Sequence, residues 1–438
     1  MRRHKVYLVP GFLGFSHLGE FSYFRGVSDR IRDGMARRGV QADIISCDTE
    51  PTGSIRRRAD HLLACVLESG GLQAEAIHLV GHSTGGLDAR LLATPGVQLR
   101  PGDDEDRVAR RLRTVVTVTT PHRGSPVANY MLTVQGRKVL EILTILATTT
   151  HSRYAAWLAA GVLGAAARAG DLAGWRGGFL DALSRGLLER LSPDRKDPVW
   201  KYLSRVAEDQ GAVVQLTPES MDVFNAAVVD RPGVAYGCVV AAAPPPPTGY
   251  TWRDALDFER LALGSLFVLL HTLAGREHGH YPCPQPDPRV VSRLQADLGF
   301  PVGPGTSDGL APLFSQLQGR VLAAVRADHL DIVGQFQDPG GGALRDWLPS
   351  GARFDREAFD RVWDRVAAFL VEGHATWALR DGPRNDPPDD ADDEEGSRPW
   401  RHAAPAPDKG EYAWPGRISR RNAGLEGPPQ GGLVDDNP

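Results

Sequence analysis

The sequence has few cysteines, no excess of either charge and no long apolar run. Only four of its 438 residues are cysteines, and none forms a C-x-x-C pair, which argues against a zinc knuckle or a redox pair. We therefore expect buried thiols rather than a disulfide framework at Cys47, Cys65, Cys238 and Cys283. The 50 basic residues against 54 acidic ones give a net charge of −4, so no nucleic-acid partner is expected.

Two apolar runs bear on membranes and export. The longer run, 261–274, falls short of the roughly 20 residues that a membrane span needs, so no transmembrane span is predicted. The run at 6–15 follows basic residues, but Pro10 and Gly11 interrupt it and no small-residue cleavage site follows. We interpret it as a first strand and a glycine turn, and expect a cytoplasmic protein. Secretion by a route that the sequence does not show is the alternative.

The first 125 residues alternate strand and helix signals. Runs rich in β-branched residues predict strands, and apolar residues at helical spacing predict helices. Strands are expected at 5–9, 42–47, 77–80 and 114–119, and helices at 24–38, 56–67 and 85–92. Continuous apolar strands separated by helices are typical of a mostly parallel sheet with helices on both faces. The predicted fold class is therefore α/β.

The rest of the chain adds helical insertions, two strands and a tail. Helices are expected at 139–147, 155–167, 261–273 and 356–371, and strands at 234–242 and 321–325. We expect one domain over 1–377, with helical cap insertions at about 130–230 and 244–300. Residues 378–438 are acidic, rich in proline and glycine and without apolar periodicity, so they are expected to form a disordered tail.

Residues 81–85 form a G-x-S-x-G motif with Ser83 at its centre. The motif alone is weak, but an apolar strand leads into it and a helix follows, which is the context of a nucleophile elbow. The backbone of such a turn is strained, and side chains on either side of the nucleophile would collide with it. Gly81 and Gly85 meet that requirement. The other interpretation is an ordinary strand–helix turn with an exposed serine.

A serine hydroxyl is a weak nucleophile unless a base accepts its proton. With an elbow of this kind the acid and the histidine follow the serine in the chain, which selects Asp308 and His329. We expect both at strand-to-loop transitions, where the active sites of α/β sheets gather. Asp328 and Asp331 are alternatives for the acid, although both lie very close to His329 in the chain.

The oxyanion hole requires two backbone amides. One is expected from Thr84, directly after the nucleophile, and the other from Phe12, in the loop after the first strand. The remaining histidines are weaker candidates for the base. We expect the elbow to aim His82 away from Ser83.

Taken in order, these blocks resemble the bacterial triacylglycerol lipases of the Pseudomonas and Burkholderia type, within the α/β-hydrolase superfamily. The similar blocks are VPGFLG at 9–14, YFRGV at 23–27, DHLL at 60–63, HLVGHSTGGLDAR at 78–90, TPHRGS at 120–125, LTPE at 216–219, SDGL at 307–310 and HLD at 329–331. The resemblance implies an α/β-hydrolase fold with a helical lid. It also implies Ser83 as nucleophile, Asp308 as acid, His329 as base, and oxyanion donors at Phe12 and Thr84.

The chain departs from that family at the oxyanion loop. It has Pro10 where the family has histidine, and Thr84 where the family has glutamine, so the bracing of the loop must differ. The family also binds a structural calcium through the aspartate two places after the catalytic histidine, and Asp331 matches that ligand. Asp287 and Asp297 lie in the right stretch for a second ligand without a matching motif. Calcium prefers six to eight oxygens, so we favour a loop-ordering hydrogen bond for Asp331.

The sequence thus predicts a serine ester hydrolase, a lipase or carboxylesterase, that forms an acyl-enzyme on Ser83 without a cofactor for the chemistry. The same triad would serve an acyltransferase, a thioesterase or a phospholipase. A non-catalytic scaffold is the rival outside enzymes. The expected partner is an acyl ester or a lipid. The apolar segment 261–273 is either a buried helix, which we favour, or a lid that contacts a lipid surface.

Overall fold

The computed structural model describes residues 3–381 except 13–16, 19–20, 134–135, 137–208, 247–257, 277–284, 337–345 and 347. The strands are β1 (His4–Val9), β2 (His17–Leu18), β3 (Phe21–Ser22), β4 (Ala42–Ser46), β5 (Ile77–His82), β6 (Leu112–Val118), β7 (Ala235–Ala242) and β8 (Arg320–Arg326). The α-helices are α1 (Val27–Ala36), α2 (Ile55–Glu68), α3 (Thr84–Ala93), α4 (Asp104–Arg111), α5 (Pro126–Met131), α10 (Gly211–Gln215), α11 (Pro218–Ala227), α12 (Phe258–Ala274), α13 (Pro288–Leu298) and α14 (Arg356–Asp381). Short 3-10 helices are η1 (Gly71–Gln73), η4 (Leu313–Gln316) and η5 (Asp331–Val333).

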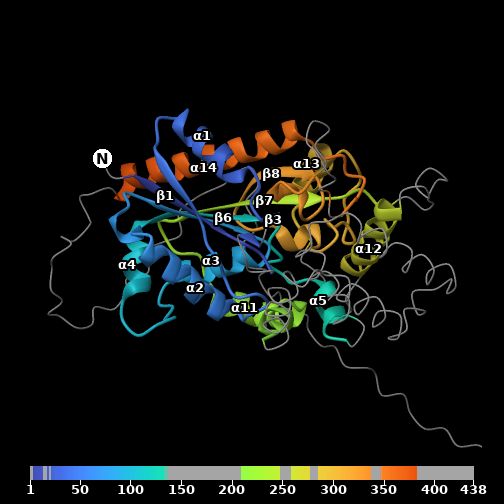
Figure 1. Cartoon of the computed structure of the whole chain (residues 1–438), viewed down its shortest axis with the longest axis horizontal. Coiled ribbons are helices and arrows are strands. Elements are labelled where there is room, and N and C mark those ends of the chain that lie inside the picture. Colours follow the sequence, from blue (N-terminus) through green and yellow to red (C-terminus); the bar gives the residue numbers. More distant parts are fainter. Residues whose placement is uncertain are drawn as a thin grey trace, which may run out of the picture.

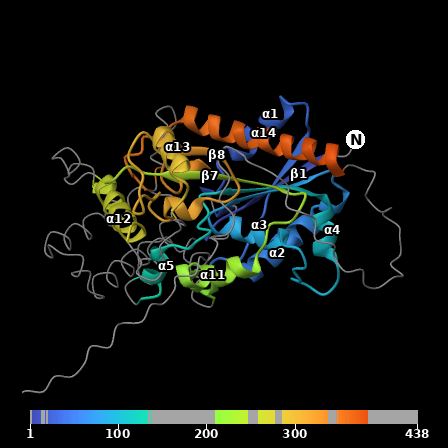
Figure 2. The same cartoon turned by 180° about the vertical axis from the view of Figure 1, so that it is seen from behind.

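A six-stranded sheet in the order β4-β1-β5-β6-β7-β8 forms the centre of the molecule, and all its strand pairs are parallel. Helices α1 and α14 lie on one side of the sheet, and α2, α3 and α4 lie on the other (Figures 1 and 2). A parallel sheet covered on both faces, with a tight strand-to-helix turn after a central strand, is the α/β-hydrolase fold that the sequence predicted.

The strands carry apolar side chains at successive positions because both faces of the sheet are buried. Along β1, Val6 and Leu8 join the core cluster that includes residues of α1 and α14. Tyr7 and Val9 point to the opposite face and join the cluster beneath α2 and α3. Since alternate residues of a strand face opposite sides, a continuous apolar run fills two cores at once.

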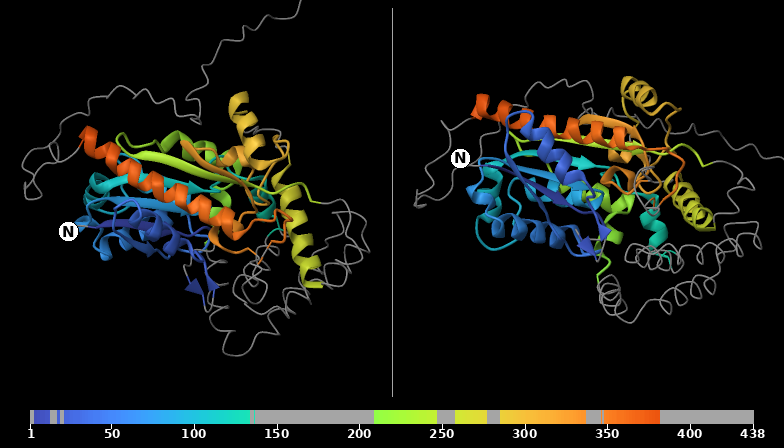
Figure 3. Two further views of the ribbon diagram at one scale, coloured as in Figure 1. Left: turned by 90° about the horizontal axis from the view of Figure 1, so that it is seen from above. Right: turned by 45° about the horizontal axis from the view of Figure 1, so that its top comes forward.

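Helix α14 is longer than expected, because it continues past 371 to Asp381. The sequence has Gly373 in this stretch, and glycine in a helix interior costs about 1 kcal/mol relative to alanine. The structure gives the reason for the glycine: a Cβ at Gly373 would lie only 2.3 Å from Cγ2 of Thr114 on β6. Helix α14 runs along one face of the sheet (Figure 3), and at Gly373 it packs too closely on Thr114 for a side chain to fit, so packing outweighs propensity.

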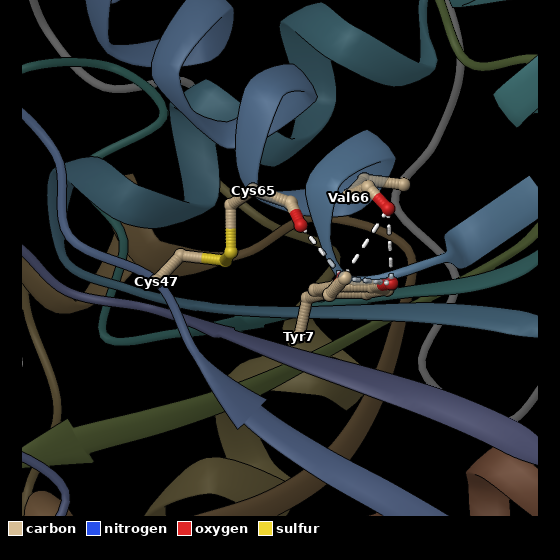
Figure 4. Close-up of a disulfide and its surroundings, with 5 residues drawn as sticks. Tyr7, Cys47, Cys65 and Val66 are labelled. Atoms are coloured by element: carbon tan, nitrogen blue, oxygen red, sulfur yellow. Dashed lines mark hydrogen bonds between the residues drawn. A yellow bond between two sulfur atoms is a disulfide. The ribbon is translucent and has the colours of Figure 1, made fainter.

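The expectation of buried thiols is wrong for Cys47 and Cys65, which form a disulfide with their Cα atoms 6.0 Å apart (Figure 4). Cys47 follows β4 and Cys65 lies on α2, so the bond ties this helix to the sheet. The two residues meet only through the packing of helix on strand, which their spacing of 18 residues does not reveal. Cys238 is a free and buried thiol, as expected. Cys283 lies outside the described residues.

Parts of the predicted cap and the predicted tail lie outside the described residues. The predicted helices at 139–147 and 155–167, and the tail from residue 382 onward, lie outside the described residues. The apolar segment at 261–273 does form a helix, α12, and its Leu266, Phe267 and Leu270 are buried in the main core. Of the helices that the structure describes, none has both the length and the apolar character to cross a bilayer.

Candidate active site

Ser83 occupies the turn between β5 and α3 with φ 53° and ψ −128°. A positive φ is strained for a residue other than glycine, and such strain is concentrated at functional sites. The turn is held in place because the Ser83 amide donates a 2.8 Å hydrogen bond to the carbonyl of Val118 on β6. The geometry has the strained strand–turn–helix form expected of a nucleophile elbow.

The glycines around Ser83 are required by close packing of backbone on backbone. A Cβ at Gly81 would lie 2.2 Å from the carbonyl oxygen of Gly85, and one at Gly85 would lie 2.3 Å from that of Val9. A Cβ at Gly11 would lie 2.8 Å from Cβ of Ser83 itself. The loop that follows β1 is therefore pressed against the serine, where an oxyanion donor would have to be.

His329 and Asp308 are in direct contact. Nδ1 of His329 lies 2.7 Å from Oδ2 of Asp308, whose side chain is fully buried. A carboxylate acceptor fixes the proton on Nδ1 and leaves Nε2 as the basic nitrogen of the ring. The backbone reinforces this pair, since the His329 amide donates to the carbonyl of Asp308 at 3.0 Å.

Three further donors hold the Asp308 carboxylate in place. Its Oδ1 accepts the amides of Leu310 and Ala311 at 2.9 and 2.7 Å, and its Oδ2 accepts Nε2 of Gln316 at 3.2 Å. The Gln316 side chain is itself fixed, because its Oε1 accepts the amide of Ala241 on β7 at 2.8 Å. No sequence motif pointed to Gln316. Its role follows from the packing of η4 against the end of β7.

Asp308 does not follow a strand, contrary to expectation. His329 does lie just after β8, but the segment of Asp308 follows α13 and is attached to the end of β7 by a 3.0 Å hydrogen bond from the Ala243 amide to the carbonyl of Ser307. The alternative acids have other partners: Oδ1 of Asp328 accepts the amide of Leu330, and Oδ2 of Asp331 accepts the amide of Asp328, both at 2.9 Å.

His82 lies beside His329, and the expectation that the elbow aims it away from Ser83 stays a prediction. Its Nε2 donates to the carbonyl of His329 at 2.8 Å, and the two rings are 4.8 Å apart. Full burial lowers the pKa of His82 well below its ordinary value, so the ring is neutral. Nδ1 must then accept a hydrogen bond, and the Tyr23 hydroxyl donates it at 2.7 Å.

Tyr23 extends this chain to the oxyanion loop, because its hydroxyl oxygen accepts the amide of Gly11 at 2.9 Å. Burial raises the pKa of Tyr23, so the hydroxyl keeps its proton. A sequence of neutral hydrogen bonds thus runs from the Gly11 amide through Tyr23 and His82 to the backbone of His329. It joins the loop after β1 to the loop after β8.

Arg58 on α2 braces the oxyanion loop from behind. Its Nη2 donates to the carbonyls of Pro10 and Gly11 at 2.8 and 3.0 Å. In a trans peptide the carbonyl and the following N–H point in opposite directions. The bond to the Gly11 carbonyl therefore aims the amide of Phe12 away from Arg58. The sequence indicated that this loop must be supported differently from the loop of the lipase family, and Arg58 provides that support.

Asp88 on α3 neutralises Arg58, and both side chains are fully buried, with a closest N–O distance of 2.8 Å. Burial raises the pKa of Asp88 from 3.8 to about 6, and the attraction of Arg58 offsets only part of that effect. Thr84, the other expected donor, opens the same helix. Among the residues that the structure describes, neither the Phe12 amide nor the Thr84 amide has a hydrogen-bond acceptor.

The expected calcium ligand Asp331 lies in a group of carboxylates. One oxygen each of Asp328, Asp331 and Asp346 lies within 4.8 Å of the others. Burial and mutual repulsion raise the pKa of Asp328 to about 8 and that of Asp331 also upward. Carboxylate oxygens are the type of ligand that a hard cation such as calcium prefers. Calcium takes six to eight oxygen ligands, so three carboxylates would need further ligands to complete the site. Asp287, which caps α13, and Asp297, which pairs with Arg293, are not part of the group.

Comparison with known proteins finds similar solved structures at low sequence identity. No sequence-family model matches the chain, and no curated protein sequence matches it. The lipase of Staphylococcus hyicus is similar with a TM-score of 0.46 at 14% identity, over 85% of this chain and 96% of its own. EstA from Clostridium botulinum has a TM-score of 0.45 at 18% identity, over 82% and 88%. Lipase 1 from Pelosinus fermentans has a TM-score of 0.47 at 16% identity, over 84% and 99%.

Proposed function

We propose that the protein is a serine ester hydrolase, a lipase or carboxylesterase, in which Ser83 is the nucleophile, His329 the base and Asp308 the orienting acid. The observation that carries this proposal is the 2.7 Å contact between Nδ1 of His329 and the buried carboxylate of Asp308. It stands together with a strained serine at the end of a central strand. Burial, fixed hydrogen bonds and an acid–histidine pair are what serine catalysis requires.

The reaction begins as Nε2 of His329 takes the proton of the Ser83 hydroxyl while Oγ attacks the ester carbonyl carbon. The tetrahedral intermediate collapses, the bond to the alcohol oxygen breaks, and Nε2 returns the proton to the leaving alcohol. Water then attacks the acyl-enzyme with His329 again as base, and the carboxylic acid leaves. Asp308 holds the ring and stabilises its positive charge in both half-reactions.

The amides of Phe12 and Thr84 are the proposed donors to the oxyanion. Arg58 supports the first by holding the carbonyl of Gly11, and the N-terminal end of α3 supplies the second. Preorganised donors of this kind stabilise charge that develops only in the transition state. The structure thus supports a proposed hole in which each donor comes from a separately braced segment.

An acyl ester, including a lipid ester, is the proposed substrate class. The similar structures are of proteins named as lipases and as EstA. Helix α12 touches the acid loop, since a Cβ at Gly309 would lie 2.7 Å from Cε2 of Phe267. An apolar helix beside the acid supports acyl-chain contact along α12, and contact of this region with a lipid surface remains part of the proposal.

The disulfide bears on where the protein works. Bonds such as Cys47–Cys65 persist in oxidising compartments and are rare in the cytosol. We therefore favour secretion over the cytoplasmic location expected from the sequence. Thiol counting on protein purified without reductant tests this, because a protein with free thiols at Cys47 and Cys65 would contradict it.

A structural calcium held by Asp328, Asp331 and Asp346 is likewise a proposal, and calcium-dependent thermal stability is its test.

Hydrolysis of p-nitrophenyl esters from acetate to palmitate tests the proposed activity. Wild type should turn over, and Ser83→Ala should lose about four orders of magnitude or more in kcat. Ser69→Ala is the control. Ser69 lies near the disulfide, where it bonds to Tyr7, and it has no part in the proposed chemistry. Wild type should also react with a fluorophosphonate probe, and Ser83→Ala should not.

Equal turnover by wild type and Ser83→Ala would place the nucleophile elsewhere. A folded wild type that neither cleaves esters nor takes the probe would support the scaffold alternative. Product analysis with a competing alcohol separates a hydrolase from an acyltransferase, because only the latter forms the new ester as its main product.

A further inference from the structure

We propose that His4, Glu75 and His374 form a zinc-binding site at the end of the sheet opposite the candidate active site. His4 opens β1, Glu75 lies just before β5, and His374 lies on the last turns of α14. One possible ligand atom of each residue lies within 4.8 Å of the others. Three distant segments thus bring together two imidazoles and a carboxylate.

Of the three residues, His374 is the one with a buried polar atom that lacks a hydrogen-bond partner among the described residues. Its Nδ1 is buried, and no described residue accepts or donates a hydrogen bond to it. Its Nε2 lies 3.6 Å from Oε1 of Glu75, beyond hydrogen-bond distance. Two ligands of a tetrahedral zinc ion, each about 2.0–2.1 Å from the metal, lie a little over 3 Å apart. The pair therefore needs only a small closure to share one ion.

His4 has the second contact that metal-binding histidines require. Its Nδ1 lies 3.0 Å from Nε2 of His78, which is fully buried on β5. Ligating histidines bind through one nitrogen and donate the N–H of the other to a fixed acceptor, and His78 supplies that acceptor. Nε2 of His4 is then left for the metal.

The donor set selects the type of ion. Imidazole nitrogens suit zinc, copper and nickel rather than calcium or magnesium, and one carboxylate with two histidines matches the three-ligand sites of zinc. Glu75 is half exposed, so water has access to the fourth position. Zinc bound here would cross-link α14 to the start of β1 and to the segment before β5.

Arg113 is the charged group that opposes a cation here. Its guanidinium carbon lies 3.3 Å from the centre of the Trp377 ring, and that ring stacks on the ring of His374 with their centres 5.9 Å apart. The carboxylate of Glu75 offsets one positive charge. The arginine therefore weakens the site without occupying it, and we expect an affinity below that of structural sites with four ligands.

Zinc binding to the full chain, first stripped with a chelator, tests the proposal. Isothermal titration should give one zinc ion per chain, and zinc should raise Tm. Cobalt in place of zinc should give the intense visible absorption of four-coordinate Co²⁺. Glu75→Gln and His374→Gln should each weaken zinc binding at least tenfold and abolish the cobalt spectrum, because each removes one of three ligands.

His61→Gln is the matched control. His61 and Glu50 also form a histidine–glutamate pair with a 3.6 Å N–O separation, but the side chain of His61 is 45% exposed whereas that of His374 is 17% exposed. This variant should bind zinc as wild type does. Glu75→Gln changes a half-exposed side chain and should keep the metal-free Tm, so a loss of binding there is not a loss of fold. The proposal is overturned if wild type binds less than one equivalent, if cobalt gives only a weak six-coordinate spectrum, or if Glu75→Gln and His374→Gln bind zinc as tightly as wild type.

Discussion

Strand β5 carries one buried histidine near each end, and the two ends use them differently. His78 and His82 are four residues apart, so they face the same side of the sheet. Burial lowers the pKa of both well below the ordinary value. In each case a hydroxyl contacts Nδ1, from Thr114 at 2.8 Å and from Tyr23 at 2.7 Å. Each histidine also contacts a second histidine through Nε2.

The two ends of β5 differ in the second histidine, which is His329 at the carboxyl end and His4 at the amino end. At the carboxyl end, His329 has a buried carboxylate on Nδ1, so its Nε2 is a base that can hold a proton. At the amino end, His4 has only the neutral ring of His78 on Nδ1, and among the described residues no carboxylate bonds to it. Burial without a carboxylate makes a poor base and a good metal ligand. The comparison shows that the partner, more than burial itself, decides what a histidine does.

The Asp308→Asn variant removes the carboxylate that distinguishes His329 from His4, and we expect it to have the largest effect on activity. The amide keeps the size of the side chain but stabilises the wrong tautomer of His329 and no longer balances its charge, so kcat should fall about 10⁴-fold. Steady-state kinetics on a p-nitrophenyl ester measures this, with circular dichroism as the check on folding. If kcat stays within about tenfold of wild type, Asp308 is not the orienting acid.

The elements around this site could be predicted because their signals are local. Each strand at 5–9, 42–47, 77–80, 114–119, 234–242 and 321–325 is present in the structure, shifted by no more than a few residues at either end. Buried parallel strands are continuous apolar runs, so their sequence signal is strong. The elbow is equally local, since its glycines and serine are adjacent. Motif order also selected the pair that the structure brings together, Asp308 and His329.

The supports of the site come from distant segments and gave weaker signals. Tyr23, Gln316 and the Cys47–Cys65 pair act through contacts that spacing does not encode. Arg58 is different, because it lies one turn before Leu62 on the apolar face of α2. An arginine on a buried stripe requires a buried partner, and Asp88 is that partner. That signal was present in the sequence and was missed.

The raised pKa of Asp88, near the carboxyl end of β5, predicts how the free energy of unfolding depends on pH. Because its pKa is about 6 in the folded protein against 3.8 ordinarily, the folded state binds this proton more tightly. Deprotonation then costs more in the folded state, and the free energy of unfolding should fall as pH rises from about 4 to about 6. One pKa unit is worth 1.36 kcal/mol, so this group contributes a fall of up to about 3 kcal/mol.

Urea unfolding of wild type and Asp88→Asn across that pH range measures the contribution. The variant leaves Arg58 without its anion and should be less stable at neutral pH, so the slopes are compared and not the absolute values. The free energy of unfolding should fall less with pH in Asp88→Asn than in wild type. Parallel slopes would mean that Asp88 is ionised in the fold throughout the range and that its burial costs less than the structure indicates.

The smallest effects should come from Tyr23→Phe and Thr114→Val, which remove the matched hydroxyl partners of the two β5 histidines. Each leaves a buried ring nitrogen without its partner, so each should lower the free energy of unfolding by about 1–3 kcal/mol. Tyr23→Phe also frees the Gly11 amide, and kcat should fall about tenfold with KM little changed, less than the loss of a direct oxyanion donor. Thr114→Val should leave kcat and KM as they are. If both variants lowered kcat alike while folded, β5 would couple its two ends, and they could no longer be treated as independent sites.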